Sequence, residues 1–174
     1  MLQRKGIHHD DALIEFIREN KENIYRLAYS YVRNKEDALD IVQESIQKAL
    51  VHVHRLRDEQ SLKSWFYKIV VNTSLDFLRK NKRVTAVDDE TLDYYASGVD
   101  DRYEDVDLER AVKQLPTDYQ SVIILRFFED LKIGEVAAVL NENTNTIKTR
   151  LYKALKLLRI ELQDDFMKEV NGNG

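Results

Sequence analysis

Basic, hydroxyl and amide side chains follow one face of a predicted helix near the C-terminus. The residues spaced to project together are Asn145, Thr149, Tyr152, Lys153 and Lys156, with Thr146, Lys148 and Arg150 beside them. Asn and Thr can hydrogen-bond base edges, and Lys and Arg bind phosphate. Residues 143–160 contain five basic residues and no acidic one, in a chain of net charge −4. This segregation of charge predicts an anionic partner such as DNA.

Two apolar repeats predict the elements that position this face. The residues that recur at helical spacing are Ile133, Val136, Ala137 and Leu140, followed by Ile147, Leu151, Ala154, Leu155 and Leu158. Asn141 lies between the repeats and tolerates positive φ, and Asn143 or Thr144 can cap the second helix. The pattern predicts a helix-turn-helix. The alternative is an amphipathic hairpin whose Lys and Arg residues only provide solubility.

Helical periodicity continues through the rest of the chain, which has five glycines and one proline, so we expect an all-α fold. A first helix is predicted from Asp10 or Asp11 to about Arg33, a second from an Asn34 cap through Val53, and a third from Ser61. Their predicted core residues are Leu13, Phe16, Ile17, Ile24, Leu27, Ala28 and Tyr31, then Leu39, Val42, Ile46, Ala49, Leu50 and Val53, then Leu62, Trp65, Phe66, Ile69, Thr73 and Phe77. Three such faces make a small bundle.

Charge divides the chain into three parts. Residues 1–83 carry 16 basic and 12 acidic residues, residues 84–107 carry one and nine, and residues 108–174 carry ten and ten. Two small helical domains, 1–83 and 108–174, joined by a flexible acidic linker, are therefore expected. The linker is either a solvated spacer or an autoinhibitory strap, since Leu92, Tyr94 and Tyr95 are unusual in a pure spacer.

The second and third predicted helices each have a polar face. On the third helix, the basic and amide residues that share an arc include Lys68, Asn72, Arg79, Lys82 and Arg83. Two basic strips on two lobes predict a grip on one duplex at two separated places. The second helix instead presents an acidic stripe of Asp37, Asp40, Gln43, Glu44 and Gln47, which is either solvated or a docking face for a basic protein.

Composition argues against several other functions. The chain has no cysteine, which excludes disulfides and thiolate metal sites. We expect no secretory signal and no membrane span, because the longest apolar stretch runs only from Val136 to Leu140. His52 and His54 lie on different faces of a helix, and no phosphate loop, nucleophile elbow or HExxH motif is present. An enzyme, a metal site and a cofactor are therefore not expected.

Three segments carry a resemblance to a known family. DALDIVQESIQKAL (37–50), SWFYKIVVNTSLDFLRKNKR (64–83) and the stretch from Leu115 to Arg159 resemble bacterial RNA polymerase sigma factors of the extracytoplasmic-function (ECF) group. The resemblance covers nearly the whole chain except its ends and the linker. It implies that residues 1–83 correspond to sigma region 2 and residues 108–174 to sigma region 4, with the linker in place of region 3.

The resemblance also implies roles for the polar faces. The acidic stripe, Asp37 to Gln47, corresponds to the surface that binds the β′ clamp helices of RNA polymerase core. Asn72 corresponds to an asparagine that reads a flipped base of the minus-ten promoter element, with Lys68, Arg79, Lys82 and Arg83 beside it. The residues that correspond to readers of the minus-thirty-five element are Asn145, Thr146, Lys148, Thr149, Arg150 and Lys153.

Further partners follow from the resemblance in the same way. It implies contact with the β flap of polymerase and with promoter DNA, and inhibition by an anti-sigma factor that holds the protein at the inner face of the membrane, with no small-molecule substrate. A cytoplasmic location is expected. The runner-up interpretation is a two-lobed helix-turn-helix regulator that does not bind polymerase core.

The chain departs from the family pattern at two places. Lys132 and Gly134 stand where a Ser cap and a Glu are common, so the first helix of the reading pair is expected to be weaker by about 1 kcal/mol. Lys148 and Lys153 stand where arginine is also common, which exchanges bidentate guanine recognition for a point charge. Base preference is therefore less well predicted than phosphate binding.

Overall fold

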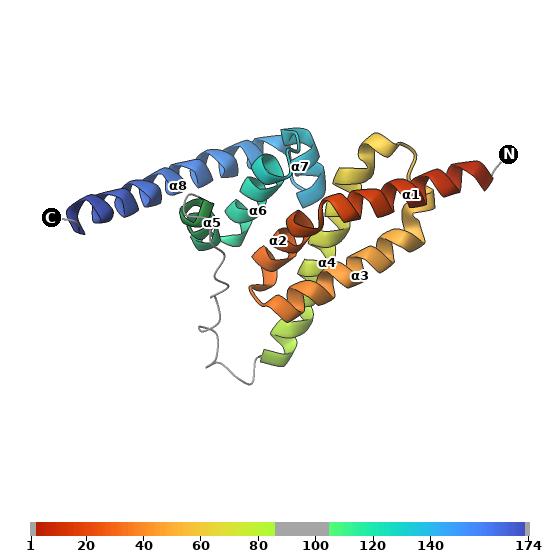
Figure 1. Ribbon diagram of the computed structural model, residues 1–174, viewed down its shortest axis with the longest axis horizontal. Helices are drawn as coiled ribbons and strands as arrows, with labels where there is room; N and C mark the ends of the chain where they lie inside the picture. The colour runs from red at the N-terminus through yellow and green to blue at the C-terminus, as the bar shows by residue number, and fades with distance from the viewer. Residues whose placement is uncertain (1–2, 86–104, 173–174) are drawn as a thin grey trace.

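The computed structural model describes residues 3–85 and 105–172, and the side chains of residues 9–81 and 108–164. Its first lobe contains α1 (Gln3–Glu19), α2 (Lys21–Val32), α3 (Lys35–His52), the 3-10 turns η1 (Val53–Arg55) and η2 (Glu59–Ser61), and α4 (Leu62–Thr85). The second contains α5 (Asp105–Gln114), α6 (Thr117–Ile123), the π-helical turn η3 (Ile124–Phe128), α7 (Ile133–Leu140) and α8 (Thr144–Gly172) (Figure 1). The all-α fold is confirmed, since the described residues contain no strand. Most of the predicted linker lies outside the described residues.

The predicted first helix is instead two helices. Helix α1 begins at Gln3, before Asp10, and ends at Glu19, and α2 begins at Lys21. Asn20 lies between them with non-helical backbone angles, φ −116° and ψ 21°, and its side-chain Nδ2 donates to the Phe16 carbonyl oxygen at 2.9 Å in competition with the backbone N–H. An Asn side chain that competes for backbone groups in this way is a common helix breaker.

The core of the first lobe is centred on α2, with α3 and α4 packed around it. Leu13, Ile24, Leu27 and Ala28 are completely buried, as predicted. The predicted inward positions on α3 are partly wrong, because Leu39 is 49% and Leu50 45% exposed. The buried residues of α3 are Ala38, Ile41, Ser45 and Ala49. Small residues let α3 approach its neighbours closely, so the larger leucines lie on its outer side.

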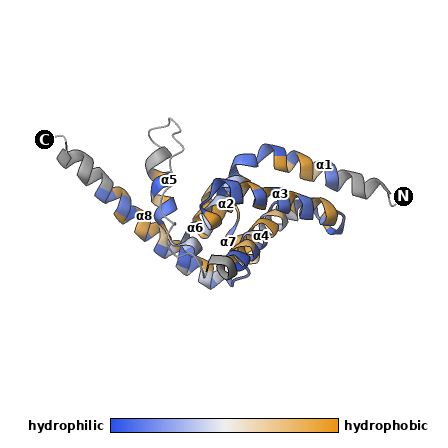
Figure 2. Cartoon of the chain, turned by 90° about the horizontal axis from the view of Figure 1, so that it is seen from below, coloured by the Kyte–Doolittle hydropathy of each residue, from blue (hydrophilic) through white to orange (hydrophobic). Residues whose placement is uncertain are grey.

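Helices α7 and α8 form the helix-turn-helix. Asn141 ends α7 in the left-handed conformation with φ 53°, and the Asn143 side chain caps α8 by accepting from the Thr146 N–H at 2.8 Å. Val136, Ala137, Ile147, Ala154 and Leu158 are buried between the two helices and the rest of the lobe. Leu155, which was predicted to be inward, is instead 43% exposed. Figure 2 shows hydrophobic and hydrophilic residues alternating along the helices, as amphipathic helices require.

The two lobes pack against each other. Helix α4 lies against α7, and α2 lies against α6 and η3. This packing buries a wider part of α4 than its apolar pattern predicts, including Tyr67, Val70, Val71 and Ser74. In Figure 1, α8 extends away from the body on one side and α1 on the other.

Candidate nucleic-acid interface

The acidic stripe lies on the solvent side of α3. Asp40, Gln43, Glu44 and Gln47 are exposed, and Asp37 is half-buried in the first turn. The Asn34 side chain caps this helix by accepting from the Asp37 N–H at 3.1 Å. Partial burial, with Asp40 and Glu36 nearby, raises the pKa of the Asp37 carboxyl group. The stripe is thus a dense negative surface, and it adjoins the exposed Leu39 and Leu50.

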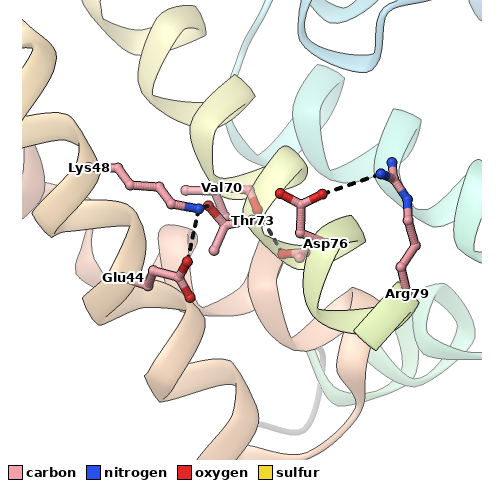
Figure 3. A network of polar contacts seen from close by, with 7 residues as sticks. Glu44, Lys48, Val70, Thr73, Asp76 and Arg79 are labelled. Carbon is pink, nitrogen blue, oxygen red and sulfur yellow. Dashed lines mark hydrogen bonds and ion pairs between the residues drawn. The ribbon is translucent and has the colours of Figure 1, made fainter. Parts of the chain in front are cut away.

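Glu44 is held in place by Lys48, one turn further along α3, as Figure 3 shows. Lys48 Nζ lies 2.9 Å from a carboxylate oxygen of Glu44 and donates to Thr73 Oγ1 at 3.2 Å. Lys48 therefore links α3 to the buried Thr73 of α4 and partly neutralises Glu44. Because Glu44 remains half-exposed, this ion pair is weak, worth about 1 kcal/mol or less, and it orients the carboxylate without removing it from the surface.

The predicted polar arc of α4 faces solvent. Lys68, Asn72 and Arg79 are all exposed, on the side opposite the buried Phe66 and Val70. The side chains of Lys82 and Arg83 lie outside the described residues. The arc also contains Asp76, which sequence reasoning overlooked: it pairs with Arg79 at 3.4 Å, as Figure 3 shows. The charge of Arg79 is therefore partly offset by Asp76, although its side chain is 74% exposed, and Lys68 and Asn72 are exposed beside it.

On the second lobe, the start of α8 presents most of the predicted reading face. Asn145, Lys148, Thr149 and Lys153 are exposed, and Thr146 is half-buried with its backbone N–H used by the Asn143 cap. The Thr149 hydroxyl group donates to the Asn145 carbonyl oxygen at 3.0 Å. This bond fixes the hydroxyl group but leaves its oxygen able to accept.

Arg150 differs from the other predicted readers. Its guanidinium donates to Glu142 at 3.0 Å, and its side chain is only 23% exposed. Sequence reasoning considered residues 143–160 alone and so missed Glu142, one residue before them, which the turn brings back over α8. Lys148 and Lys153 are consequently the stronger candidates for contact with an anionic ligand.

The start of α7 is capped, contrary to expectation. Glu135 accepts from the Lys132 backbone N–H at 2.7 Å. In a full capping box the first residue's side chain also accepts from the backbone N–H of the fourth, but a lysine side chain has no acceptor, so only the bond to Glu135 is present. This bond makes the start of α7 less weak than expected. Together these features define the class of the molecule: a two-lobed all-α protein with a helix-turn-helix in its second lobe.

Comparison with known proteins shows which family this chain resembles. Residues 16–84 match the model of sigma-70 region 2, and residues 105–158 match the model of sigma-70 region 4. RNA polymerase sigma factor SigV of Bacillus subtilis is 56% identical over 86% of this chain and 90% of its own length. ECF RNA polymerase sigma factor SigW of the same organism is 30% identical over 88% of this chain and 90% of its own.

The chain therefore belongs to the RNA polymerase sigma factors of the ECF group. As a member of this family, it binds RNA polymerase core and directs transcription initiation at promoters. The predicted resemblance is confirmed.

Solved structures share the fold. The sigma factor RpoE in complex with the anti-sigma factor NepR from Bartonella quintana superimposes with a TM-score of 0.72, at 24% identity, over 86% of this chain and 97% of RpoE. CnrH in complex with the cytosolic domain of CnrY gives a TM-score of 0.63, at 18% identity, over 94% of this chain and 96% of CnrH. Among the described residues, no helix has the length and apolarity needed to cross a membrane. No group of three or more potential metal ligands occurs among them either.

Proposed function

We propose that each of the three exposed faces has a separate function: one binds polymerase core, one the minus-ten element and one the minus-thirty-five element. Residues 1–83 form the polymerase-binding and minus-ten domain, residues 84–107 the linker, and residues 108–174 the minus-thirty-five domain. The observation that carries this proposal is that three polar faces, each on a different helix, point away from the cores that hold those helices in place. A structural role would not require one face to be mainly acidic and the other two mainly basic.

The acidic face of α3 is the docking surface for the β′ clamp helices. Asp40, Gln43, Glu44 and Gln47 provide exposed acceptors, and Asp37 extends the negative field to the start of the helix. Leu39 and Leu50 add an apolar margin, so the surface combines charge steering with hydrophobic contact. Contact with the β flap is assigned to the second lobe as a whole.

The two remaining faces bind promoter DNA. Asn72 and Lys68, supported by Arg79, Lys82 and Arg83, contact the minus-ten element, where strands separate. The residues assigned to the minus-thirty-five element are Asn145, Thr146, Lys148, Thr149, Arg150 and Lys153. Of these, Arg150 serves mainly to hold the turn through Glu142.

An anti-sigma factor is the proposed inhibitor. Two structures that share the fold are of complexes, RpoE with the anti-sigma factor NepR and CnrH with the cytosolic domain of CnrY. We further propose that this chain acts in the cytoplasm, that its anti-sigma factor holds it at the inner face of the membrane, and that it performs no chemistry itself.

The docking face can be tested by charge reversal. Asp40→Lys together with Glu44→Lys should lower the affinity for purified polymerase core by at least tenfold, because two attractive contacts become repulsive. Both side chains are exposed, so helix content and melting should change little. The matched control reverses Glu15 and Glu19, which are exposed on α1. Unchanged core binding by the folded double variant would contradict the assignment and favour a regulator that acts without polymerase.

A further inference from the structure

A cavity of about 970 Å³ lies where the first lobe meets the second. Its apolar lining includes Ile24, Val42 and Ile46 of the first lobe and Val112, Ile124 and Phe128 of the second. Cavities of about 300–1,000 Å³ that are mainly hydrophobic and contain a few polar groups are typical binding sites for small molecules. Three turns of an α-helix occupy about 1,200 Å³, so the volume suits a small molecule better than a protein helix.

Gln120 of α6 brings a hydrogen-bond acceptor without a partner to the wall of this cavity. Its side chain is buried, with only 3% of the residue exposed, and its Oε1 has no hydrogen-bond partner among the described residues. Burying an acceptor without a donor costs free energy, which a donor on a ligand would recover. The cavity therefore suits a ligand that carries an N–H or O–H group at this point.

Two lysines line the end of the cavity nearest Gln120. The residue that follows Gln120 is hydrogen-bonded at 2.7 Å to the hydroxyl group of Tyr31, in the last turn of α2. Lys113 Nζ lies 5.7 Å from the centre of the Tyr29 ring in the same turn, and Lys35 begins α3 just after it. The acceptor and the two ammonium groups therefore lie toward the same end of α2.

The charge at this end of the cavity is positive. Lys35 and Lys113 are exposed, and neither forms an ion pair among the described residues. Of the acidic residues described in the lining, Glu109 is paired with Arg26 at 3.1 Å, and Glu22 lies at the opposite end of α2. An anionic headgroup is therefore favoured beside the lysines.

The rest of the lining is suited to a hydrocarbon chain. Ile24 and Ile124 are buried, and Val42 and Ile46 are half-buried along one side of α3. A hydrocarbon chain covers such a surface without bringing in polar groups that need partners of their own. Each methylene group that it buries should strengthen binding about fourfold.

We propose that this cavity binds a small acylated anion with an amide group next to its headgroup, the chemistry of an N-acyl amino acid. The acyl chain occupies the apolar part of the lining, the amide N–H donates to Gln120 Oε1, and the carboxylate is attracted by Lys35 and Lys113. Leu39 is the one described residue that both lines the cavity and belongs to the docking face of α3. The site is thus separate from most of the surfaces assigned to polymerase and promoter DNA.

Three probes that differ by one group test the site on the full chain. N-dodecanoylglycine has all three features, dodecanoyloxyacetic acid has an ester in place of the amide, and N-dodecanoylglycinamide has no charge. Calorimetry below the concentration at which the probes form micelles should show saturable binding of N-dodecanoylglycine at one site. The ester should bind about tenfold more weakly, because it has no donor for Gln120. The glycinamide should bind about fivefold more weakly.

The length of the chain provides a further measurement on the same protein. N-decanoylglycine, which has two methylene groups fewer, should bind about 15-fold more weakly than N-dodecanoylglycine. No saturable binding of any probe would overturn the site and leave the cavity as a surface for a protein segment. Equal affinity for the three dodecanoyl probes would also overturn it, because the polar end would then recognise nothing.

Gln120→Met removes the acceptor and keeps a side chain of similar volume. This variant should bind the amide and ester probes equally, whereas the parent chain prefers the amide. A change in packing alone would weaken both probes alike, so the ratio of the two affinities isolates the hydrogen bond. If the variant is folded by circular dichroism and keeps the parent's preference, the assignment to Gln120 is overturned.

The headgroup is tested in the same way. Lys35→Gln and Lys113→Gln should each reduce the preference for N-dodecanoylglycine over its glycinamide, and added salt should reduce it in the parent chain. Lys80→Gln, the same change at an exposed position of α4 outside the lining, is the matched control. A preference that is unchanged in both lysine variants would overturn the placement of the carboxylate. None of these measurements involves polymerase or DNA, so they are independent of the proposed function.

Discussion

Asn72 is one of the few side chains of α4 that is exposed, neutral and able both to donate and to accept hydrogen bonds. It lies one helical turn after Lys68 and about two turns before Arg79, so cations that attract phosphate stand on both sides of it. An amide in this position suits capture of an unstacked base, for which the phosphate contacts provide the positioning.

Asn72→Ala should therefore impair promoter opening more than duplex binding. We expect a strong loss of transcription from a closed duplex and a smaller loss from a template whose minus-ten region is already unpaired, because extracting a base costs a few kcal/mol only in the first case. In vitro transcription from both templates measures the difference. Equal loss on the two templates would show that Asn72 has no role in base capture.

Lys148 and Lys153 differ from Arg150 in what surrounds them. Both lysines are exposed, whereas Arg150 is committed to Glu142. Lys148→Ala and Lys153→Ala should each weaken binding of the holoenzyme to promoter DNA and reduce the salt slope by about one where the lysine contacts phosphate. Arg150→Ala should act more through stability. Titrations over a range of salt concentrations separate these effects, and salt slopes unchanged in the two lysine variants would contradict phosphate contact.

Helix α7 shows how a single side chain can compensate for a missing cap. Glu135→Ala should destabilise the second lobe by about 1 kcal/mol, because the Lys132 N–H loses its acceptor at 2.7 Å. Glu135→Gln should retain most of the stability, since the amide oxygen can still accept. Denaturant unfolding measures both, and equal stability of the alanine variant and the parent chain would exclude the cap.

The sequence predicted most of the helices but assigned some of their inner faces incorrectly. Periodicity located α3, α4, α7 and the start of α8, and the turn chemistry of Asn34 and Asn141 was predicted correctly because each cap depends on local geometry. The orientation of α3 was wrong because large apolar residues were assumed to be inward. Packing between helices favoured the small Ala38, Ser45 and Ala49 instead. Such a choice depends on neighbouring helices and cannot be predicted from one helix alone.

At the scale of the whole molecule, the sequence predicted two lobes but not their contact. The hydroxyl group of Tyr67 in α4 donates to the carboxylate of Glu129 at the end of η3, and both residues are buried where the lobes meet. Glu129 belongs to an acidic turn and Tyr67 to an apolar helix, and 62 positions separate them. No local pattern relates two such residues. Asp76 and Glu142 also reduce the positive charge of the DNA-binding faces. Asp76 lies three residues before Arg79 on one helix, a spacing that the sequence could have shown, whereas only the turn brings Glu142 near Arg150. The candidate site residues were therefore predicted as exposed groups, but their pairing was not.

The packing of the two lobes against each other should depend on pH through Glu129. Burial is the main cause that raises the pKa of this carboxyl group above its ordinary value of 4.5, and the nearby Lys63, Arg26 and Asn23 only partly oppose it. Burial beside Glu129 also raises the pKa of Tyr67, which stays protonated. The packed arrangement thus holds the Glu129 proton more tightly than an arrangement in which Glu129 is in water. The contribution of this proton to packing is complete below pH 4.5 and is lost as the pH rises through the raised pKa.

Energy transfer between dyes attached to Glu15→Cys on α1 and Arg159→Cys on α8, both exposed positions in a chain without native cysteine, should therefore increase as the pH falls from neutrality. Glu129→Gln, which has no proton to lose at this site, should keep the lobes packed and show no such dependence over the same range. A parent chain whose energy transfer does not change with pH while it remains folded would contradict the linkage.

The π-helical turn η3 has a consequence for how relatives of this chain should be aligned. The Glu129 N–H donates to the Ile124 carbonyl oxygen at 3.0 Å, five residues back, so the turn holds one more residue than an α-helical turn would. One extra residue advances the phase of the helix by about 100°. The number of residues in this turn therefore determines which side chain contacts Tyr67. In a relative with one residue fewer in this turn, a different side chain would face α4, even if all other residues were identical.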